Sequence, residues 1–525
     1  MRILISDQVD GICAEVLRNE GFEVIDRPGL KGDDLKKAIN DVDALVVRSS
    51  TQVTADILAA AGSLKVVGRA GAGVDNVDCD AATRRGIIVM NTPGGNTIST
   101  AEHTMSMLLS LSRNIPQANE SLKKGQWDRK KFTGTELSGK TIGVVGLGKI
   151  GREVAVRCQA FGMTTVGFDP VLASEVAVKL KIELVTLDDL FARSDFVTVH
   201  TPLNDETRGL IDDEAIQKCK NGVRFINCAR GGIIDEGALL RGIEAGKIAG
   251  AALDVFVSEP PINNPLLANS RVIATPHLGA STEEAQEKVA RQIAVQIADM
   301  FKDRGIAGAV NAEVVQMAMR QDVKPYITLA EKLGSLEAQL GGGKLKHITV
   351  TTVGPTLTQS GELITAAVLK GVLSHHLSEP VNLINAPVIA REMGIALSEK
   401  KEAESGSYTQ LVKVEHESDS GKRTAAGTVF GDVHPRIVQI DGFYLEAIPE
   451  GHMLFYKNID RPGMLASVGS ILAGSGINIA GLALGRDMPG KRAITIMNVD
   501  SPIPSEVLKK LATIDGVFEV KLARL

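Results

Sequence analysis

The stretch that decides the fold is T-I-G-V-V-G-L-G-K-I-G at residues 141–151. Its apolar start predicts a β-strand, and the helix-like R-E-V-A-V-R follows it. Between them, Gly146, Gly148 and Gly151 satisfy the spacing G-x-G-x-x-G. The first glycine permits a tight turn, the second lets the backbone approach a pyrophosphate, and the third lets the helix pack on the sheet. Free N–H groups at the helix N-terminus favour an anion there, so the stretch predicts a dinucleotide-binding turn.

A carboxylate in the next strand–helix unit supports this interpretation. Asp169 ends the strand predicted after the turn. At this position a carboxylate usually accepts a hydrogen bond from a ribose hydroxyl of the dinucleotide. A carboxylate there repels the 2′-phosphate of NADP. We therefore expect NAD as the cofactor.

Short apolar segments alternate with helix-like segments on both sides of the turn. Before it, five segments predict strands at 2–6, 22–25, 44–47, 65–67 and 87–90. From the turn onward, six segments predict strands at 141–145, 165–168, 196–199, 223–227, 250–255 and 272–274. The spacing predicts two α/β units with parallel sheets, of which the second is doubly wound.

Two long helices are predicted between these units. In N-T-I-S-T-A-E-H-T-M-S-M-L-L, Ser99 or Thr100 is expected to cap the first helix. In S-T-E-E-A-Q-E-K-V, Ser281 and Glu284 are expected to form a capping box for the second helix. This second helix carries one apolar face and is predicted to lead back to the first unit. The first domain would then be discontinuous, with the second inserted into it.

The C-terminal part has a different character. Residues from about 318 to 450 mix helix with strand, include G-G-G and a polar hairpin-like stretch at 400–425, and contain no catalytic constellation. From His452 onward the predicted order is β-α-β-β-α-β, which is ferredoxin-like. Pro462 is expected in the first turn of the first helix of this unit.

Length and composition exclude several classes of protein. At 525 residues the chain is too long for one core, so three or four domains are expected. Apolar residues make up 44% and charged residues 23%, which is typical of soluble globular proteins. The net charge is −5, and the sequence contains no block of basic residues of the kind that binds a nucleic-acid phosphate backbone. We therefore expect no nucleic-acid partner.

The cysteines predict neither a metal site nor a disulfide framework. Five of them are scattered, without any C-x-x-C spacing, at Cys13, Cys79, Cys158, Cys219 and Cys228. Free thiols in a reducing compartment are the simplest interpretation. The N-terminus M-R-I-L-I-S-D has no signal-peptide pattern, and no apolar run approaches the roughly 20 residues of a membrane span. We therefore expect a cytoplasmic protein without a membrane partner.

Three residues that follow predicted strands suggest hydride transfer to and from a hydroxy acid. Arg230 in N-C-A-R-G-G can grip carboxylate oxygens with its guanidinium fork. His277 in A-T-P-H-L-G-A can take up the hydroxyl proton, and Glu259 in D-V-F-V-S-E-P can orient that imidazole. Each also has a simpler interpretation: a structural histidine, an arginine paired with a surface acid, and a turn glutamate. With the glycine turn nearby, we favour catalysis.

The sequence resembles the D-isomer-specific 2-hydroxyacid dehydrogenases over about residues 1–310. The motifs that carry the resemblance are V-R-S-S-T, G-R-A-G-A-G-V-D-N-V-D, A-E-H-T, G-L-G-K-I-G, H-T-P-L, N-C-A-R-G-G-I-I-D-E, A-L-D-V-F and P-H-L-G-A. Further on, N-I-D-R-P-G-M-L followed by G-I-N-I-A resembles an ACT regulatory domain. The whole chain is similar to the long form of the family, which has an intervening domain and an ACT tail.

The resemblance implies four domains. They are a flavodoxin-like substrate domain at 1–98 and 283–315, a Rossmann NAD-binding domain at 99–282, an α+β intervening domain at 316–450 and a ferredoxin-like ACT domain at 451–525. It also implies the activity, which is NAD-dependent oxidation of 3-phospho-D-glycerate to 3-phosphooxypyruvate. That reaction is the first step of L-serine biosynthesis.

The resemblance implies roles for named residues around the cofactor. Arg230, Glu259 and His277 match the family's catalytic residues, with His277 as acid and base. The implied cofactor contacts are Ala72, Lys149, Ile150, Asp169, Thr201, Cys228, Ala229, Arg230, Asp254, His277, Leu278, Gly279 and Ala280, in addition to the glycines of the turn. Asp254 is expected near the nicotinamide amide, whereas His103 in A-E-H-T is interpreted as structural.

The resemblance also implies a substrate side. Its residues are Arg48, Arg69, Gly71, Gly73 and Asn96, and the two arginines could bind the substrate phosphate. The basic run W-D-R-K-K at 127–131 is a second candidate for the phosphate, acting in the site of a neighbouring subunit. An ordinary solvated turn is an equal alternative for that run.

The ACT resemblance implies L-serine as a feedback inhibitor, bound between two paired copies of the domain. The positions that match the effector pocket are Asn458, Asp460 and Asn478. Asp460 would hold the ammonium group, and Asn478 the carboxylate or hydroxyl. Asn458 departs from the His or Tyr expected at its position, so an ACT domain that only dimerises is an alternative.

Two other functions stay open at this point. One is a different D-2-hydroxyacid dehydrogenase, acting on 2-hydroxyglutarate, hydroxypyruvate or glyoxylate. The other is a non-catalytic, NAD-sensing corepressor-like protein, which would need a partner groove or an interaction tail. A homotetramer with ACT–ACT and Rossmann–Rossmann contacts is implied by the resemblance alone.

Overall fold

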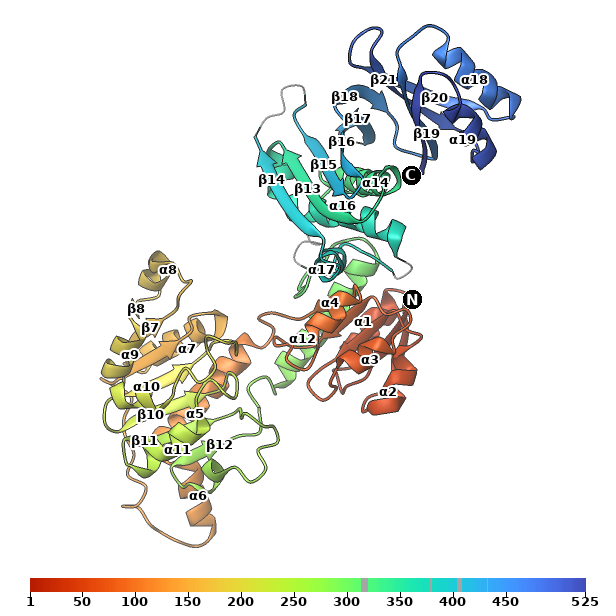
Figure 1. The fold of residues 1–525 in the computed structure, drawn as a ribbon. Coiled ribbons are helices and arrows are strands. Elements are labelled where there is room, and N and C mark those ends of the chain that lie inside the picture. Colours follow the sequence, from red (N-terminus) through yellow and green to blue (C-terminus); the bar gives the residue numbers. More distant parts are fainter. Residues whose placement is uncertain (313–319, 378–379, 404–407, 432) are drawn as a thin grey trace.

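The computed structural model describes residues 1–312, 320–377, 380–403, 408–431 and 433–525. Four β-sheets follow one another along the chain, each with its own helices (Figure 1). The domain boundary predicted between 315 and 316 and part of the hairpin-like stretch predicted at 400–425 lie outside the described residues. The predicted domain bounds therefore stay a prediction, while the fold class is confirmed for each of the four sheets.

The first sheet is parallel and has the flavodoxin-like order β2-β1-β3-β4-β5. Its strands are β1 (Arg2–Ile5), β2 (Glu23–Asp26), β3 (Ala44–Val47), β4 (Val66–Arg69) and β5 (Ile88–Met90). Helices α1 (Ile12–Asn19), α2 (Gly32–Ile39), α3 (Ala55–Ala59) and α4 (Cys79–Arg84) connect them. All four residues of β3 are buried, as expected for a strand covered by helices on both faces.

The second sheet is also parallel, with the Rossmann order β12-β11-β10-β9-β6-β7-β8. Its strands are β6 (Thr141–Val145), β7 (Thr164–Phe168), β8 (Glu183–Leu184), β9 (Phe196–Val199), β10 (Val223–Asn227), β11 (Ile248–Leu253) and β12 (Val272–Ala274). Its helices are α6 (Ile115–Lys123), α7 (Lys149–Ala160), α8 (Ser174–Lys179), α9 (Leu187–Arg193), α10 (Asp213–Lys218), α11 (Glu236–Glu244) and a 3₁₀ helix (Pro265–Ala268). The sequence analysis missed β8, which is too short to show a pattern.

Two helices cross between these units, α5 (Thr97–Arg113) and α12 (Glu283–Phe301). Helix α12 returns to the first sheet, where Ile293 and Ile297 belong to the same buried cluster as Ile3 and Ile5. A Cβ at Gly68 would lie 2.7 Å from the Cδ1 of Ile297, so a glycine in β4 allows this close packing. The first unit is thus completed by a helix that follows the second.

Two predicted helix caps are wrong. Ser99 and Thr100 lie inside α5, whose N-cap is Asn96, and both hydroxyls donate to a carbonyl outside the helix. The N-cap of α12 is Thr282, whose hydroxyl accepts from the backbone N–H of Ala285, so the capping box of Ser281 does not form. At α5 the two hydroxyls are engaged by Gly279 and the N-cap Asn96 forms no side-chain cap hydrogen bond, whereas at α12 the hydroxyl residue next to the predicted one caps the helix.

The third sheet has the order β14-β13-β15-β16-β17-β18 and is antiparallel except between β13 and β14. Its strands are β13 (Leu345–Val353), β14 (Ala396–Glu402), β15 (Leu411–Ser418), β16 (Gly421–Phe430), β17 (His434–Ile440) and β18 (Phe443–Ala447). Helices α14 (Lys324–Leu340), α15 (Pro355–Gln359), α16 (Gly361–His376) and α17 (Ala386–Glu392) complete the unit. Buried residues of α14 and α16 form its core with the sheet.

The fourth sheet is antiparallel, with the order β20-β21-β19-β22, and confirms the ferredoxin-like prediction. Its elements are β19 (His452–Ile459), α18 (Met464–Gly474), β20 (Ile479–Arg486), β21 (Arg492–Val499), α19 (Ser505–Ala512) and β22 (Val517–Arg524). One prediction is wrong here, because α18 begins after its N-cap Gly463 and leaves Pro462 outside the helix.

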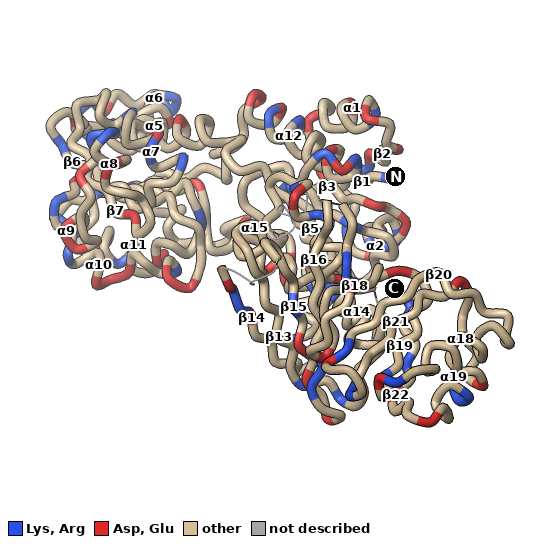
Figure 2. The backbone as a smooth tube through the Cα atoms, turned by 90° about the horizontal axis from the view of Figure 1, so that it is seen from above, with Lys and Arg blue, Asp and Glu red and all other residues tan. Residues whose placement is uncertain are grey.

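The third unit contacts both of its neighbours. The side-chain amide of Asn382 donates to the carbonyl of Gly86 at 2.8 Å, and Arg84 at the end of α4 pairs with Glu392 of α17 at 3.0 Å. On its other side, Met453 and Phe455 of β19 share one buried cluster with α14 and α16. Basic and acidic residues are interspersed along all units (Figure 2). Within the described residues, we find no helix with the length and apolarity of a membrane span.

A buried carboxyl group lies where the third and fourth units meet. Glu337 of α14 is 1% exposed, and within the described residues neither of its carboxylate oxygens has a hydrogen-bond partner. The nearest ring nitrogen, Nδ1 of the buried His416, is 3.9 Å away. Burial raises the pKa of Glu337 to about 8, against the attraction of the nearby Arg423 charge. Glu337 is therefore mostly protonated at neutral pH.

The Glu337 carboxyl should make stability depend on pH. Its folded-state pKa of about 8 lies above the unfolded value of about 4.3, so the folded state binds the extra proton between these values. The free energy of unfolding should fall as pH rises through this window, by about 1.4 kcal/mol per unit of pKa difference. Glu337→Gln should remove this loss, so that the variant gains urea resistance relative to the wild type between about pH 5 and pH 8.

The matched control is Glu362→Gln on the exposed face of α16. It should follow the wild type at every pH. A Glu337→Gln variant whose urea midpoint also stays parallel to the wild type would contradict a protonated Glu337.

Candidate active site

The three glycines of the turn after β6 are each required for a different reason. Gly146 has φ +88°, and a Cβ there would lie 2.7 Å from the carbonyl oxygen of His200. A Cβ at Gly151 would overlap the carbonyl oxygen of Gly146, so this glycine allows α7 to pack against the turn. Around Gly148, the N-cap of α7, a Cβ would meet nothing within 4 Å. The space above Gly148 is thus open for a ligand at the helix N-terminus.

Residues around this turn fit a dinucleotide. Thr201 follows β9, beside the turn, and its buried hydroxyl has no hydrogen-bond partner among the described residues. Asp169 follows β7 and accepts the backbone N–H of Leu147 at 2.8 Å. Burial acts to raise the pKa of Asp169, but backbone hydrogen bonds outweigh it and hold this pKa below its usual value. An ionised carboxylate therefore lies beside the glycine turn, as binding of a ribose requires.

The catalytic candidates follow three adjacent strands of the same sheet. Arg230 comes after β10, Glu259 after β11 and His277 after β12. Because parallel strands end at one edge, all three lie on the edge that carries the glycine turn. A Cβ at Gly231 would overlap the backbone of Phe256, so the turn after Arg230 packs against the segment that leads to Glu259.

The imidazole of His277 and the carboxylate of Glu259 are hydrogen-bonded, with Nδ1 2.8 Å from Oε2. The other carboxylate oxygen accepts the backbone N–H of Phe256 at 3.1 Å. Burial acts to raise the pKa of Glu259, but the hydrogen bond and charge of His277 outweigh it, so this pKa lies below its usual value. The ionised carboxylate engages Nδ1 and leaves Nε2 as the ring nitrogen that can exchange a proton.

The loop of His277 is organised by the carboxylate of Asp254, which is 0% exposed. Its Oδ1 accepts the hydroxyl of Thr275 at 2.6 Å and the N–H of Leu278 at 2.7 Å, and its Oδ2 accepts the N–H of Gly279 at 2.8 Å. His277 itself has φ +55°, a left-handed conformation that costs about 1 kcal/mol or more. The hydrogen bonds to Asp254 hold the loop in that conformation.

Helix α5 fixes the same loop from the other side. The Nε2 of His103 lies 3.1 Å from Oδ1 of Asp254. The hydroxyls of Ser99 and Thr100 donate to the carbonyl of Gly279 at 2.6 and 3.1 Å. The helix that crosses between the two units is therefore hydrogen-bonded to the loop that carries the candidate base, His277.

Arg230 connects the second unit to the first. Its Nε donates to Oδ2 of Asp75 at 2.9 Å, and a Cβ at Gly73 would overlap its guanidinium. The buried amide of Asn227 positions the turn, because it donates to the carbonyl of Arg230 at 2.8 Å. Gly73 and Asp75 lie in the loop after β4, so the guanidinium bridges the two units. We call the region around it, between this loop and the carboxyl edge of the second sheet, the cleft.

Positive charge accumulates on the first-unit side of this cleft. The Nε of Arg69 is buried without a partner among the described residues, and a Cβ at Gly71 would overlap its guanidinium. Burial and the charge of Arg230 lower the pKa of Arg69 to about 10. Burial also lowers the pKa of Arg48. Arg69 and Arg230 thus lie close enough to repel each other, and this arrangement suits an anion.

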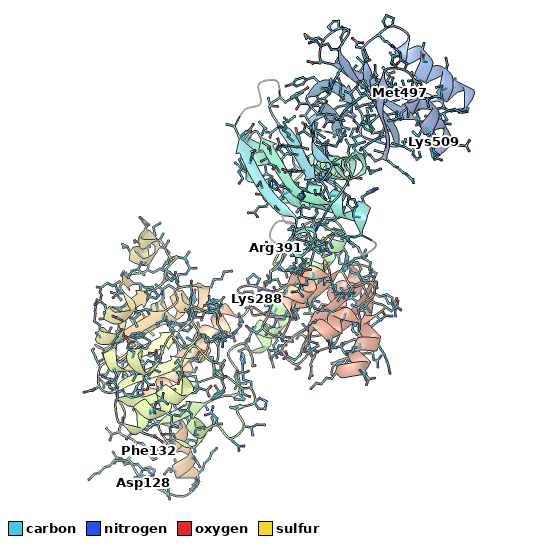
Figure 3. All side chains as sticks on the ribbon, viewed as in Figure 1. Asp128, Phe132, Lys288, Arg391, Met497 and Lys509 are labelled. Atoms are coloured by element: carbon cyan, nitrogen blue, oxygen red, sulfur yellow. The ribbon has the colours of Figure 1, made fainter. Side chains whose placement is uncertain are left out.

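The remaining predicted contacts surround this cleft. Lys149 reaches from α7 to the carbonyl of Pro93 at 3.4 Å, and Ala72 accepts the amide of Asn91 at 2.5 Å. Asn96 is the N-cap of α5. Four further residues flank the turns described above: Ile150, Cys228, Ala229 and Ala280. The basic run at 127–131 does not join them, since its loop lies beside α6 at the far end of the second unit, where Figure 3 labels Asp128 and Phe132.

The predicted effector residues are not brought together within one chain. Asn458 is buried and donates to the carbonyl of Ile459 at 2.7 Å, while its side-chain oxygen has no partner among the described residues. Asp460 pairs with Arg486 at 3.4 Å, and Asn478 donates to Asp500 at 2.7 Å. Each makes its own local contact.

The comparisons with known proteins agree with this geometry. Residues 105–279 match the family description "D-isomer specific 2-hydroxyacid dehydrogenase, NAD binding domain". Residues 322–441 match "D-3-phosphoglycerate dehydrogenase intervening domain", and residues 452–516 match "ACT domain". The D-3-phosphoglycerate dehydrogenase of Archaeoglobus fulgidus is 42% identical over 100% of both chains. The chain belongs to the D-3-phosphoglycerate dehydrogenase family.

Other members of the family are similarly close. The D-3-phosphoglycerate dehydrogenase of Bacillus subtilis is 42% identical over 100% of this chain and 99% of its own. That of Rattus norvegicus is 50% identical over 75% of this chain and 74% of its own. The crystal structure of the Aquifex aeolicus D-lactate dehydrogenase with NAD and lactic acid covers 58% of this chain and 96% of its own. Its TM-score is 0.53 and its identity 26%. The predicted cofactor, NAD, is confirmed by the NAD-binding family match.

Some residues of the cleft were missed by the sequence analysis. Asn227 stands in the motif N-C-A-R-G-G and Asp75 in G-A-G-V-D-N, yet neither was assigned a role there. An asparagine at the end of a predicted strand, three residues before the arginine, was the available signal for the first. For Asp75 no local signal exists, since its partner lies 155 residues away.

Two glycines of the turn allow a matched test of cofactor binding. Gly148→Ala adds a methyl group only where the pyrophosphate is expected, so NADH affinity should fall at least ~10-fold while thermal stability stays unchanged. Gly151→Ala creates a backbone overlap in the protein itself, so both NADH affinity and the melting temperature should fall. Fluorescence titration with NADH and thermal unfolding provide the two measurements. Unchanged NADH affinity in Gly148→Ala would contradict the assigned cofactor position.

Proposed function

We propose that the chain oxidises 3-phospho-D-glycerate to 3-phosphooxypyruvate with NAD, the first step of L-serine biosynthesis. The observation that carries the proposal is the cluster of Arg69 and Arg230 across the cleft, whose positive charge exceeds what Asp75 neutralises. A substrate with both a carboxylate and a phosphate would supply the missing negative charge. The family match and the relatives named D-3-phosphoglycerate dehydrogenase support the same reaction.

In this proposal the anionic groups of the substrate are held at two places. Arg230 and the backbone at Gly71 and Gly73 bind the carboxylate of the substrate. Arg230 then replaces part of its contact with Asp75 by a contact with that carboxylate. Arg48 and Arg69 bind the phosphate. Charge-assisted hydrogen bonds from guanidinium groups are stronger than neutral ones, and their forked geometry fixes the orientation of the substrate.

The proton is handled by the pair of His277 and Glu259. His277 removes the hydroxyl proton through Nε2 as the hydride leaves the substrate carbon, and Glu259 stabilises the resulting imidazolium through Nδ1. Bound NAD accepts the hydride. Since Glu259 is already ionised and hydrogen-bonded to the ring, it needs no rearrangement before the reaction.

Closure of the two units is expected to complete the site. The crossings at 96–101 and 280–290 are the segments at which the units would rotate, and helix α5 would carry the loop of His277 with it. Closure would exclude water and align the donor carbon with the acceptor. Lys149 already bridges the units through the carbonyl of Pro93.

We also propose that paired ACT domains bind L-serine. Asp460 and Asn478 would contribute from different copies, because they do not meet within one chain. This arrangement requires an oligomer, for which a homotetramer with ACT–ACT and Rossmann–Rossmann contacts is the proposed state. In such an assembly the basic run at 127–131, which lies away from its own cleft, could act in a neighbouring site.

The reaction is tested by replacing the base. His277→Asn should lower kcat at least ~10²-fold while leaving NADH affinity unchanged, because it removes proton transfer and keeps a polar side chain. NADH formation from 3-phosphoglycerate and NAD gives the rate, and hydroxypyruvate, glyoxylate and 2-oxoglutarate in the reverse direction test the related substrates. Full turnover in His277→Asn would contradict the assignment. Tight NADH binding by the wild type without turnover on any substrate would favour an NAD-sensing protein.

Serine regulation is tested with a matched pair of carboxylates. Asp460→Asn should raise the serine concentration for half-inhibition at least ~10-fold, because the ammonium group loses a charged partner. Asp487→Asn changes an exposed carboxylate in the same domain and should leave inhibition unchanged. Both variants should keep the wild-type kcat without serine. Equal serine sensitivity in all three proteins would argue against an effector site at Asp460.

A further inference from the structure

Helix α5 presents one stripe of side chains to the loop that carries the candidate base. Ser99, His103 and Met107 are spaced four residues apart, so they lie on one face of the helix. The hydroxyl of Ser99 donates to the carbonyl of Gly279 at 2.6 Å, and the sulfur of Met107 lies 3.7 Å from the hydroxyl of Thr275. His103 lies between these two residues of the helix. The stripe therefore follows the loop from Gly279 back to Thr275.

The imidazole of His103 contacts two oxygens below this loop at the same time. Its Nε2 lies 3.1 Å from Oδ1 of Asp254 and 3.1 Å from Oγ1 of Thr275. The hydroxyl proton of Thr275 is already donated to Oδ1 of Asp254, at 2.6 Å. Both oxygens can therefore only accept from His103, so Nε2 carries a proton and is the donor to them.

The other donors to Asp254 come from the loop itself. The carboxylate is 0% exposed, and it accepts the hydroxyl of Thr275 and the backbone N–H groups of Leu278 and Gly279. These three donors lie on both sides of the candidate base in the sequence. His103 is the donor that comes from a different element, the helix that crosses between the first and second units. The contact therefore ties the base of the loop to a rigid helix.

The charge of Asp254 depends on His103 as well. Burial acts to raise the pKa of Asp254, but the hydrogen bond of His103, together with those from the loop, outweighs it and holds this pKa below its usual value. Two other titratable groups face the carboxylate. Burial and the charge of Asp254 raise the pKa of the Cys228 thiol to about 12, so the thiol stays neutral. Burial and the same charge act to raise the pKa of Glu259, which the hydrogen bond of His277 nevertheless keeps low. Neither group brings a positive charge to Asp254.

We propose that His103 is a positioning residue of the reaction, which holds Asp254 and thereby keeps the loop of His277 aligned with the cofactor and the substrate. The sequence analysis interpreted His103 as structural, because its partner lies 151 residues further along the chain. The proposal rests on the role of His277 as acid and base, and it does not depend on which hydroxy acid is oxidised. Since α5 begins at the crossing between the units, the same contact makes the loop follow the helix when the units close (Figure 1).

Three replacements of His103 separate this role from simple packing. Glutamine keeps an N–H donor that can reach Asp254, leucine has no donor, and the amide of asparagine is too short to reach. His103→Leu and His103→Asn should lower kcat at least ~10-fold without changing KM for 3-phosphoglycerate, because they misalign the base and leave the substrate arginines in place. His103→Gln should recover most of the lost kcat. The control is Glu102→Gln, which changes an exposed residue of the same helix and should behave as the wild type.

The pH profile gives a readout that a merely structural role would not move. In the reductive direction, with 3-phosphooxypyruvate and NADH, His277 acts as the acid, so its protonation at low pH does not limit the rate. The loss of rate on the acidic side then reports the carboxylates of Asp254 and Glu259. Without the donor of His103 the pKa of Asp254 should rise, so the acidic limb of kcat should move to higher pH in His103→Leu and keep its position in His103→Gln. A smaller folded fraction would instead lower kcat by the same factor at every pH.

Thermal unfolding of each variant over the same pH range checks the fold. A wild-type kcat with an unmoved acidic limb in His103→Leu or His103→Asn would overturn the proposal. Equal losses in these variants and in His103→Gln would also overturn it, because the shape of the ring and not its donor would then matter. His277→Asn, measured beside them, keeps the result apart from the proposed function. Full turnover in His277→Asn rejects the assigned base, whereas an inactive His277→Asn with an unchanged His103→Leu rejects the role of His103 alone.

Discussion

The catalytic half of the molecule depends on one buried charge, the carboxylate of Asp254. An ionised carboxylate without exposure costs several kcal/mol unless it is fully hydrogen-bonded, and here it accepts from a hydroxyl and two backbone N–H groups, with His103 beside it. Those donors belong to the loop of His277 and to the crossing helix α5. The requirement to satisfy Asp254 therefore fixes the candidate base and the interdomain helix relative to each other.

The opposite wall of the cleft shows the reverse situation, in which charge is left unsatisfied. Arg69 and Arg230 lie close enough that repulsion and burial lower the pKa of Arg69 to about 10, and the buried Nε of Arg69 has no partner among the described residues. A protein keeps such a cluster where a ligand supplies the opposite charge. The site thus joins a fully satisfied polar network, which positions the base, to an unsatisfied one, which is ready for an anion.

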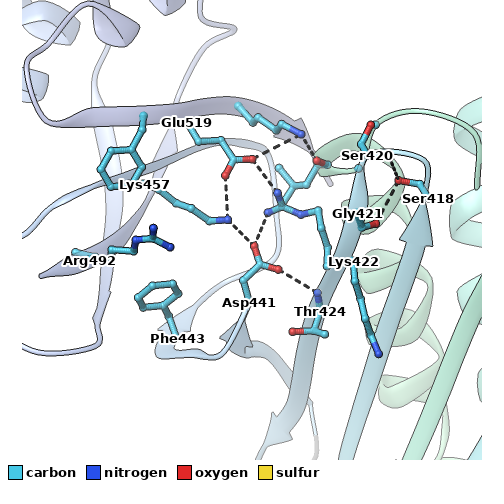
Figure 4. Close-up of a pocket in the computed structure, with 17 residues that line it drawn as sticks. Ser418, Ser420, Gly421, Lys422, Thr424, Asp441, Phe443, Lys457, Arg492 and Glu519 are labelled. Carbon is cyan, nitrogen blue, oxygen red and sulfur yellow. Dashed lines mark hydrogen bonds and ion pairs between the residues drawn. The ribbon is translucent and has the colours of Figure 1, made fainter.

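Satisfied and unsatisfied polar groups also lie side by side at the junction of the intervening and ACT units. The carboxylates of Asp441 and Glu519 are both shared by Arg423 and Lys457 (Figure 4), while the nearby Glu337 is kept mostly protonated by burial. The intervening unit also contacts α4 through Asn382 and the pair of Arg84 and Glu392. Since α4 follows the loop of Gly73 and Asp75, the regulatory half of the chain is joined to the part of the first unit that contacts Arg230.

The sequence by itself determined the elements that depend on local pattern. The strands of both parallel sheets except β8, the glycine turn and the ferredoxin-like order of the last unit were predicted correctly, because apolar alternation and glycine spacing are local properties. The positions of Arg230, Glu259 and His277 after three adjacent strands also followed from the sequence. Tertiary structure alone decided that the hydroxyls of Ser99 and Thr100 donate to the carbonyl of Gly279 instead of capping α5.

The contacts of Arg230 with Asp75 and of His103 with Asp254, and the ion pair of Arg423 with Glu519, were likewise decided only by the tertiary structure. The physical reason is that each joins residues more than a hundred positions apart, or residues of two separate units. A local pattern in the sequence cannot predict such contacts.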